Sequence, residues 1–450
     1  MSTRTRARWF RITAVVLPLA LLLILDLALG LAGIVPPEDP LLFYARTYQQ
    51  EFSPFRATGD GNLEVRPDWV NPGVNLQATR GAAAGRFFLH PGFRQVRFKT
   101  EPGPDTIRIF VLGGSSAYGL YVGEQEAFSG QLRMLLEQRY PERSFEVINL
   151  GCPGWASNRV LNLMRSLCGL DPDLFVVYSG HNELLQGKVD RGPEIEDSRW
   201  RLRLLQASNL YRWIDYLVSS ARRGQEFQEV REDMAALEAG RSLVFDPSSL
   251  PAEQRQRPDP AVLKDAADQF GSNVARMLEL GSGTGVPVIL GLPVANLWSP
   301  PTVAAGDLLT REGSPESTRF LEGLQALQEG RLGEAAGILG DLAGSEPDDA
   351  GLHFWLGVTL FQAGSTAAGR LELQAALDRD VRTHRISSPM EQALLKAGGD
   401  QVLDFRPVLR PAGTSAEAAE LFSDHCHPTK KGHRLIADAL LPNIELLLGL

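Results

Sequence analysis

The sequence predicts an α/β protein in which a parallel sheet is covered by helices on both faces, a three-layer α/β/α arrangement. Short apolar stretches with strand character alternate with stretches of helical spacing from about residue 105 onward. The apolar strand stretches are bounded by glycines and followed by small polar residues, which is typical of buried parallel strands that end at a ligand-binding edge. We expect the core to comprise residues 105–183, 260–298 and 384–450.

Five stretches are predicted as strands, and the helices between them follow from periodicity. The first helix is expected over "EAFSGQLRMLLEQRY", the second over "SNRVLNLMRSLCGL", and the last begins near Lys431. The strands, in chain order, are "TIRIFVLGG", "SFEVINLG", "DPDLFVVYSG", "VPVILGLPVANL" and "QVLDFRPV".

The chain begins with a basic tail, residues 1–11, followed by an apolar run over 12–35. This pattern predicts a signal anchor that crosses the inner membrane of a bacterium once, with the tail in the cytoplasm and the rest in the periplasm. A cleaved signal peptide is the alternative, although "LGLAGIVPP" offers only a weak cleavage site. Asp26, within the run, marks either a helix partner or a position near the membrane interface.

Composition excludes some classes of protein. A chain of 450 residues with 44% hydrophobic residues is long enough for more than one globular domain. The net charge of −9 and the lack of a basic stripe beyond the first residues argue against a nucleic-acid partner. Three cysteines, Cys152, Cys168 and Cys426, are too few for a disulfide scaffold.

Three segments lie outside the predicted core. Residues 36–104 are expected to form a β-rich collar. Residues 184–259 are charged and helical, and "RWRLRLLQASNLYRWIDYLV" within them is either a lid or membrane-facing helix, or a helix on the flank of the core. Residues 316–381 form the third segment.

This third segment contains a repeat with a period of 34 residues. Gly330 matches Gly364, and Leu327 matches Phe361. A helix-turn-helix unit of this length resembles tetratricopeptide repeats, and two units are visible. We expect them to lean on the core, where they either bind a protein partner or support the fold.

Four polar motifs follow strand ends or precede the last helix: "GGSSAYG", "NLGCPGWAS", "SGHNE" and "SDHCHPT". Loops at the carboxyl edge of a parallel sheet converge on one crevice. Together the motifs supply a hydroxyl, a glycine N–H, a side-chain amide and an Asp–His pair, which are the groups that acyl transfer requires.

These four motifs, in this order, resemble the four blocks of the SGNH, or GDSL-type, hydrolases. The resemblance covers the predicted core alone and implies a flavodoxin-like sheet and a serine esterase. It assigns the nucleophile to Ser115, the base to His427 and the orienting carboxylate to Asp424. The oxyanion donors would be the N–H groups of Ser115 and Gly151 and the amide of Asn182.

The sequence departs from the family pattern at two places. Gly114 replaces the usual acidic residue before the nucleophile, and Ser116 offers a second hydroxyl, although the family register favours Ser115. Glu183 stands where the family has an aspartate, which keeps the charge.

The other polar residues near the motifs are expected to be structural. His181 lines a loop, and His425 and His433 are not metal ligands, because His427 would have to serve as ligand and base at once. A disulfide between Cys152 and Cys426 is an alternative to free thiols in an oxidising compartment.

These observations predict an esterase of the cell envelope that needs no cofactor or metal and acts on O-acylated glycans or lipids. Three alternatives stay open: an acyltransferase that passes the acyl group to a polysaccharide, a lipase, and a non-catalytic binding module that uses the repeats.

Overall fold

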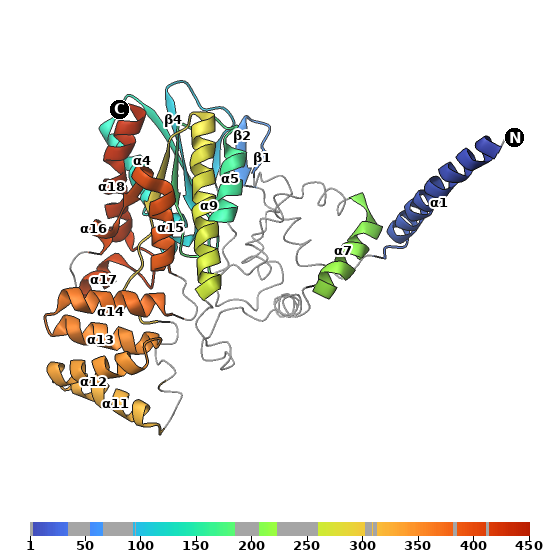
Figure 1. Cartoon of the computed structure of the whole chain (residues 1–450). Helices are drawn as coiled ribbons and strands as arrows, with labels where there is room; N and C mark the ends of the chain where they lie inside the picture. The colour runs from blue at the N-terminus through green and yellow to red at the C-terminus, as the bar shows by residue number, and fades with distance from the viewer. Residues whose placement is uncertain are drawn as a thin grey trace. The chain divides into compact units, whose positions relative to one another are not determined.

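The structure is a computed structural model that describes residues 3–34, 55–65, 93–94, 96–184, 207–222, 260–301, 308, 313–380, 385–410 and 414–450. The chain divides into two compact units. The larger unit holds the sheet, the candidate site and the repeats, and the smaller one holds two helices near the N-terminus and in the first insertion (Figure 1).

A five-stranded parallel sheet forms the centre of the larger unit, as predicted. Its strands lie in the order β5-β4-β6-β7-β8, so that the first strand along the chain is flanked by the second and the third. This is the doubly wound order of flavodoxin-like sheets, which places a crevice at the carboxyl ends of the first and third strands. The strands are β4 (Thr106–Gly113), β5 (Ser144–Gly151), β6 (Leu174–Tyr178), β7 (Val288–Leu292) and β8 (Val402–Asp404).

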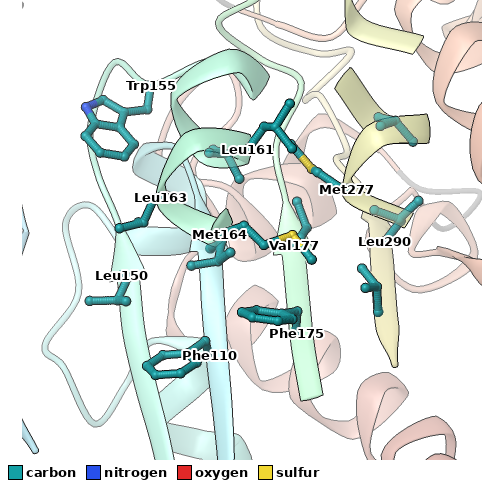
Figure 2. Packing of buried hydrophobic residues seen from close by; sticks show 14 of the residues in the cluster. Phe110, Leu150, Trp155, Leu161, Leu163, Met164, Phe175, Val177, Met277 and Leu290 are labelled. Carbon is teal, nitrogen blue, oxygen red and sulfur yellow. The ribbon is translucent and has the colours of Figure 1, made fainter. Parts of the chain in front are cut away.

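Helices cover both faces of the sheet, which confirms the three layers. Alternate residues of β4 enter different cores: Phe110 belongs to one apolar cluster and Ile109 to the other. The first cluster includes residues of α5 (Ser157–Leu167), α9 (Pro260–Thr284) and α15 (Ser388–Gly398). Figure 2 shows its packing, with Met164 of α5 and Met277 of α9 near Phe175 and Val177 of β6.

The second cluster lies between the opposite face and α4 (Phe128–Arg139), α16 (Arg406–Leu409), α17 (Ser415–Leu421) and α18 (Lys430–Leu448). The part of the larger unit around the parallel sheet also contains two short elements, α3 (Ser115–Tyr118) and the 3₁₀ turn Gly399–Gln401. The helices α4, α5 and α18 lie where the sequence predicted them. The short helices α3, α16 and α17 were not predicted, because helices of four to seven residues carry too few turns for a periodic pattern.

A small antiparallel sheet within the predicted collar packs on the core. It consists of β1 (Phe55–Ala57), β2 (Asn62–Val65) and β3 (Arg97–Lys99). Arg108 of β4 joins it to the core, because its fully buried guanidinium donates to the carbonyls of Lys99 and Leu170 and pairs with Glu146. A buried arginine is stable only when its donors are paired in this way.

Four helices follow β7 and stack side by side (Figure 1): α11 (Pro315–Gln328), α12 (Leu332–Ser345), α13 (Ala350–Gln362) and α14 (Thr366–Asp378). The 34-residue period has a structural cause at the two turns. Gly330 joins α11 to α12 and Gly364 joins α13 to α14, and both have a positive φ, 75° and 86°, which side chains disfavour. The partner expected for these repeats stays a prediction.

The smaller unit contains α1 (Thr3–Leu31) and α7 (Asn209–Arg222), which contact each other. Asp26 of α1 accepts hydrogen bonds from Ser208 Oγ and Leu210 N, at 3.0 and 2.7 Å, at the start of α7. Asp26 therefore has hydrogen-bond partners at the start of a second helix, and both alternatives given for it in a membrane stay predictions. Residues 185–206 and 223–259 of the insertion lie outside the described residues, and the two alternatives for its helix, a lid or membrane-facing helix and a helix on the flank of the core, stay predictions.

The predicted membrane anchor is not supported. Within the part of the chain that the structure describes, no helix combines the length and the apolar character needed to cross a membrane. The cellular location stays a prediction from the sequence.

Candidate active site

The candidate nucleophile stands at the carboxyl end of strand β4, in a turn whose two glycines leave no room for side chains. Gly113 ends the strand with φ 153°, and a side chain there would collide with the backbone of Tyr178. A Cβ on Gly114 would lie 2.8 Å from Asn182 Nδ2. The two glycines therefore let Ser115 begin α3 directly beside the loop that carries Asn182.

Ser115, His427 and Asp424 form a continuous hydrogen-bonded chain. His427 Nε2 lies 2.7 Å from Ser115 Oγ, and His427 Nδ1 lies 2.6 Å from Asp424 Oδ2. The fold thus brings together residues that are 312 positions apart. In the neutral ring, Nδ1 donates to the carboxylate, so Nε2 presents its lone pair to the serine hydroxyl, as a general base must.

The loop between α17 and α18 holds the carboxylate in place. Asp424 Oδ1 accepts the N–H groups of Cys426 and His427, both at 2.9 Å. Burial raises the pKa of Asp424, but the hydrogen bond and charge of His427 outweigh it and hold the pKa well below its usual range. Asp424 is therefore ionised at neutral pH.

The charges around His427 favour its protonated form. Burial disfavours a charged ring, but the Cys426 sulfur and the Asp424 carboxylate raise the pKa of His427 above its usual value. The reciprocal effect of His427, together with His425, lowers the pKa of Cys426, which burial alone would raise. The sulfur lies 3.8 and 3.9 Å from the two ring nitrogens. Both nitrogens already face Asp424 and Ser115, so this contact is electrostatic and not a directed hydrogen bond.

The geometry separates the two candidate hydroxyls. Ser116 is buried, and its Oγ donates to the carbonyl of Cys426 at 3.1 Å. Its hydroxyl therefore stabilises the loop between α17 and α18 that carries Asp424 and His427, which we call the acid–base loop. Ser115 Oγ, in contrast, faces the imidazole.

The predicted oxyanion donors are only partly brought together. The N–H of Ser115, at the start of α3, has no i−4 carbonyl to bond within the helix. Asn182 Nδ2 donates to Trp155 O at 2.9 Å and has a second hydrogen near Gly114.

Gly151 has an acceptor for its N–H within the protein, and its role as an oxyanion donor stays a prediction. Its N–H donates to Asn149 Oδ1 at 2.9 Å, and the residue is still paired with Gly113 in the sheet. A side chain at Gly151 would collide with the backbone of Tyr118. The glycine is therefore required so that α3 can pack closely on β5.

Sequence reasoning missed several residues that support the site. Asn149 Nδ2 donates to Ala117 O at 3.0 Å and to Ser129 Oγ at 2.8 Å, and so fixes α3 to β5 and α4. Its only signal was a single polar residue in the apolar strand "VINLG". Asn296, in the loop after β7, donates its side-chain amide to Asp424 O at 3.0 Å.

The remaining acidic and histidine residues have structural partners. Glu183 accepts hydrogen bonds from Ser157 N and Oγ at 3.0 and 2.8 Å. His181 Nδ1 accepts the N–H of Ile386, and burial lowers its pKa well below the usual value. His433 accepts the N–H of Phe128, and burial lowers its pKa to about 3.

One group of side chains has the composition of a metal site. The ligand atoms of Asp424, His425, Cys426 and His427 all lie within 4.8 Å of one another. Both ring nitrogens of His427 are directed at Ser115 and Asp424, an arrangement that a metal ion would have to disrupt. No disulfide links Cys152, Cys168 and Cys426, all of which are among the described residues, so the alternative of a disulfide between Cys152 and Cys426 is not supported.

Comparisons with known proteins add little to this site. No known protein family and no curated protein matches the sequence. Among solved structures, the acetyl xylan esterase AlAXEase is similar with 11% identity and a TM-score of 0.32, over 75% of this chain and 100% of that one. LAE5, an alpha/beta hydrolase enzyme from the metagenome of Lake Arreo, Spain, has 13% identity and a TM-score of 0.29, over 76% and 95%. TM-scores this low do not establish a shared fold.

Proposed function

We propose that this protein is a serine hydrolase of the SGNH type that cleaves carboxylic esters through an acyl-enzyme. The observation that carries the proposal is the chain from Ser115 through His427 to Asp424, with contacts of 2.7 and 2.6 Å. A serine hydroxyl is a weak nucleophile until a base removes its proton, and this arrangement supplies the base and orients it.

In the proposed first step, Ser115 Oγ attacks the ester carbonyl carbon while His427 Nε2 takes its proton. Asp424 stabilises the imidazolium that results, without itself taking the proton. When the tetrahedral intermediate collapses, the bond to the alcohol oxygen breaks and His427 protonates the leaving alkoxide. Water then repeats the sequence on the acyl-enzyme, releases the carboxylic acid and restores the Ser115 hydroxyl.

The negative charge that develops on the carbonyl oxygen needs donors that are already in place. The N–H of Ser115 and the free hydrogen of the Asn182 amide are the two donors that we assign to this role. Each donor of this kind contributes about 10²- to 10³-fold to the rate in related chemistry.

The experiment that tests the proposal measures hydrolysis of aryl esters of increasing acyl length by the full chain and by Ser115→Ala. We expect the variant to lose at least about 10³-fold in kcat. It should also lose covalent labelling by a fluorophosphonate. Absence of both activity and labelling in the wild-type chain would refute the proposal.

Ser116→Ala is the matched control, because it deletes the neighbouring hydroxyl from a residue that does not face the imidazole. This variant should still be labelled by the fluorophosphonate. Transfer of the acyl group to an added glycan, in preference to water, would assign the acyltransferase alternative to the same site. The acyl-length preference tests the proposed envelope substrates: acetate points to O-acylated glycans and longer chains to lipids.

A further inference from the structure

The loop that follows α3 contains a residue in an unusual backbone conformation. Tyr121 has φ 70°, in the left-handed region that bulky side chains rarely occupy. The residue is also 55% exposed, so burial of the ring does not explain why a tyrosine stands there. Backbone strain of this kind persists where the surrounding structure enforces it, and it is often found at functional sites.

The enforcing contact comes from the segment next to the small antiparallel sheet. Arg94 donates to Tyr118 O and Gly119 O at 2.9 Å and to Val122 O at 3.0 Å. Its guanidinium also lies over the Tyr118 ring, 4.3 Å from the centroid. One fixed cation thus holds the carbonyl groups on both sides of Tyr121.

The loop that Arg94 binds places Tyr121 next to His427 and Asp424, the acid–base pair. Its ring meets the ring of His427 edge to face, with centroids 5.4 Å apart and an interplanar angle of 89°. Its hydroxyl hydrogen-bonds the Asp424 side chain. Tyr121 therefore contacts both the base and the carboxylate that orients it.

We propose that Tyr121 is a positioning residue of the catalytic pair, whose phenol shares the Asp424 carboxylate with His427 and whose strained backbone is held by Arg94. The inference rests on the proposed function. It adds a fourth side chain that sets the basicity and orientation of His427, and nothing in the sequence motifs points to it.

The phenol acts on a pair that is surrounded by other ionisable groups. His425 and Cys426 belong to the loop of the pair itself, His181 to the loop after β6, and His433 to α18. A substitution at Tyr121 leaves every one of them in place. A change in the titration of His427 is therefore attributable to the lost phenol.

The sign of the effect follows from the direction of the hydrogen bond. The phenol donates to the carboxylate and withdraws part of its negative charge from His427. In Tyr121→Phe the carboxylate faces the imidazole alone, so the protonated ring is more stable and the pKa of His427 rises. Because catalysis needs the neutral ring, the acid limb of the pH profile of kcat/KM moves to higher pH. At a pH below the limb, kcat/KM falls about tenfold for every pH unit by which the limb moves.

The experiment compares the full wild-type chain with Tyr121→Phe and Tyr140→Phe. Tyr140 also donates to a carboxylate, that of Glu445, at 2.9 Å, but it lies at the end of α4. Tyr140→Phe thus makes the same chemical change outside the site. We expect the acid limb to move upward in Tyr121→Phe by about 0.5 to 1 on the pH scale, and to stay in place in Tyr140→Phe.

A fall in kcat at every pH with an unmoved limb would overturn the inference, because a merely structural role predicts that result. The titration of His427, followed by NMR of its ring in the absence of substrate, gives a readout that does not need turnover. If the wild-type chain hydrolyses no ester, the proposed function fails, and the NMR titration still decides whether Tyr121 sets the pKa of His427.

Discussion

At Asp424, both carboxylate oxygens accept hydrogen bonds within a loop of four residues: Oδ1 from two backbone N–H groups and Oδ2 from the imidazole of His427. The pair of Asp424 and His427 can be recognised in the sequence because a short loop with this spacing brings the two side chains close together. Ser115 is recognisable for a different reason, since the glycines before it are required by a turn at a strand end.

The effect of the Cys426 sulfur on the pKa of His427 can be tested by substitution of the cysteine. The sulfur raises the pKa of His427, so Cys426→Ser, which removes that charge, should lower it. Because the base must be neutral, the acid limb of kcat/KM should move to lower pH, by about one pH unit or more. The measurement is the pH dependence of ester hydrolysis, and the limb moves in the direction opposite to that expected for Tyr121→Phe.

Cys168→Ser is the control for this substitution. Cys168 lies at the end of α5, where burial raises the pKa of the thiol, so it is neutral and carries no charge to remove. Its substitution should leave the limb in place. An unmoved limb in Cys426→Ser would mean that the Cys426 thiol is protonated beside His427.

At the scale of elements, the helix pairs α11–α12 and α13–α14 have a glycine at the same position of the repeat. The two pairs differ in how well they would tolerate a side chain there. Gly323 of α11 and Gly357 of α13 are 34 residues apart, and each faces the second helix of its pair. A Cβ on Gly357 would lie 2.9 Å from Gly369 O, which is backbone. A Cβ on Gly323 would lie 2.9 Å from the Leu339 side chain, which can adjust.

We therefore expect Gly357→Ala to destabilise the protein by about 1–3 kcal/mol, because α13 and α14 must separate. Gly323→Ala should cost less, since the gain in helix propensity of about 1 kcal/mol offsets the adjustment of Leu339. Denaturant unfolding of the two variants measures the difference. Equal losses would show that the close approach of α13 and α14 does not limit the packing.

The strands were more predictable than the short helices around the site. Each strand of the parallel sheet is largely apolar and is bounded by turn residues, and its position follows from this local pattern. The helix α3 has only four residues and forms because β4 ends beneath it and Asn149 binds its carbonyl groups. Its sequence, "SSAY", carries no helical signal of its own.

At the scale of the whole larger unit, a polar connection links the end of the helical repeats to the acid–base loop. Asp380, just after α14, forms a buried ion pair with Arg385 at 2.9 Å. Arg385 also donates to Asn296 O at 3.4 Å and to Ser299 O at 2.9 Å. Asn296 in turn donates to the carbonyl of Asp424.

Breaking this ion pair should affect the entire unit. Arg385→Met removes the charge partner of the buried Asp380 carboxylate, which typically costs about 3–5 kcal/mol of folding free energy. The double variant Asp380→Asn with Arg385→Met should recover part of that loss, because no buried charge is left. Denaturant unfolding tests both, and a loss below about 1 kcal/mol in the single variant would contradict the expectation.

The strands of the parallel sheet, the two helical layers, the repeat and the three residues of the hydrogen-bonded chain were all determined by the sequence itself. They depend on local patterns: apolar runs, periodicity, glycines at turns and a short Asp–His spacing. The tertiary structure alone decided that α3 packs closely on Gly151, that the Ser116 hydroxyl bonds the carbonyl of Cys426, and that Arg94 holds the loop of Tyr121. The physical reason is that a hydrogen bond between residues far apart in the chain depends on where the sheet places their backbones, and no local pattern records that distance.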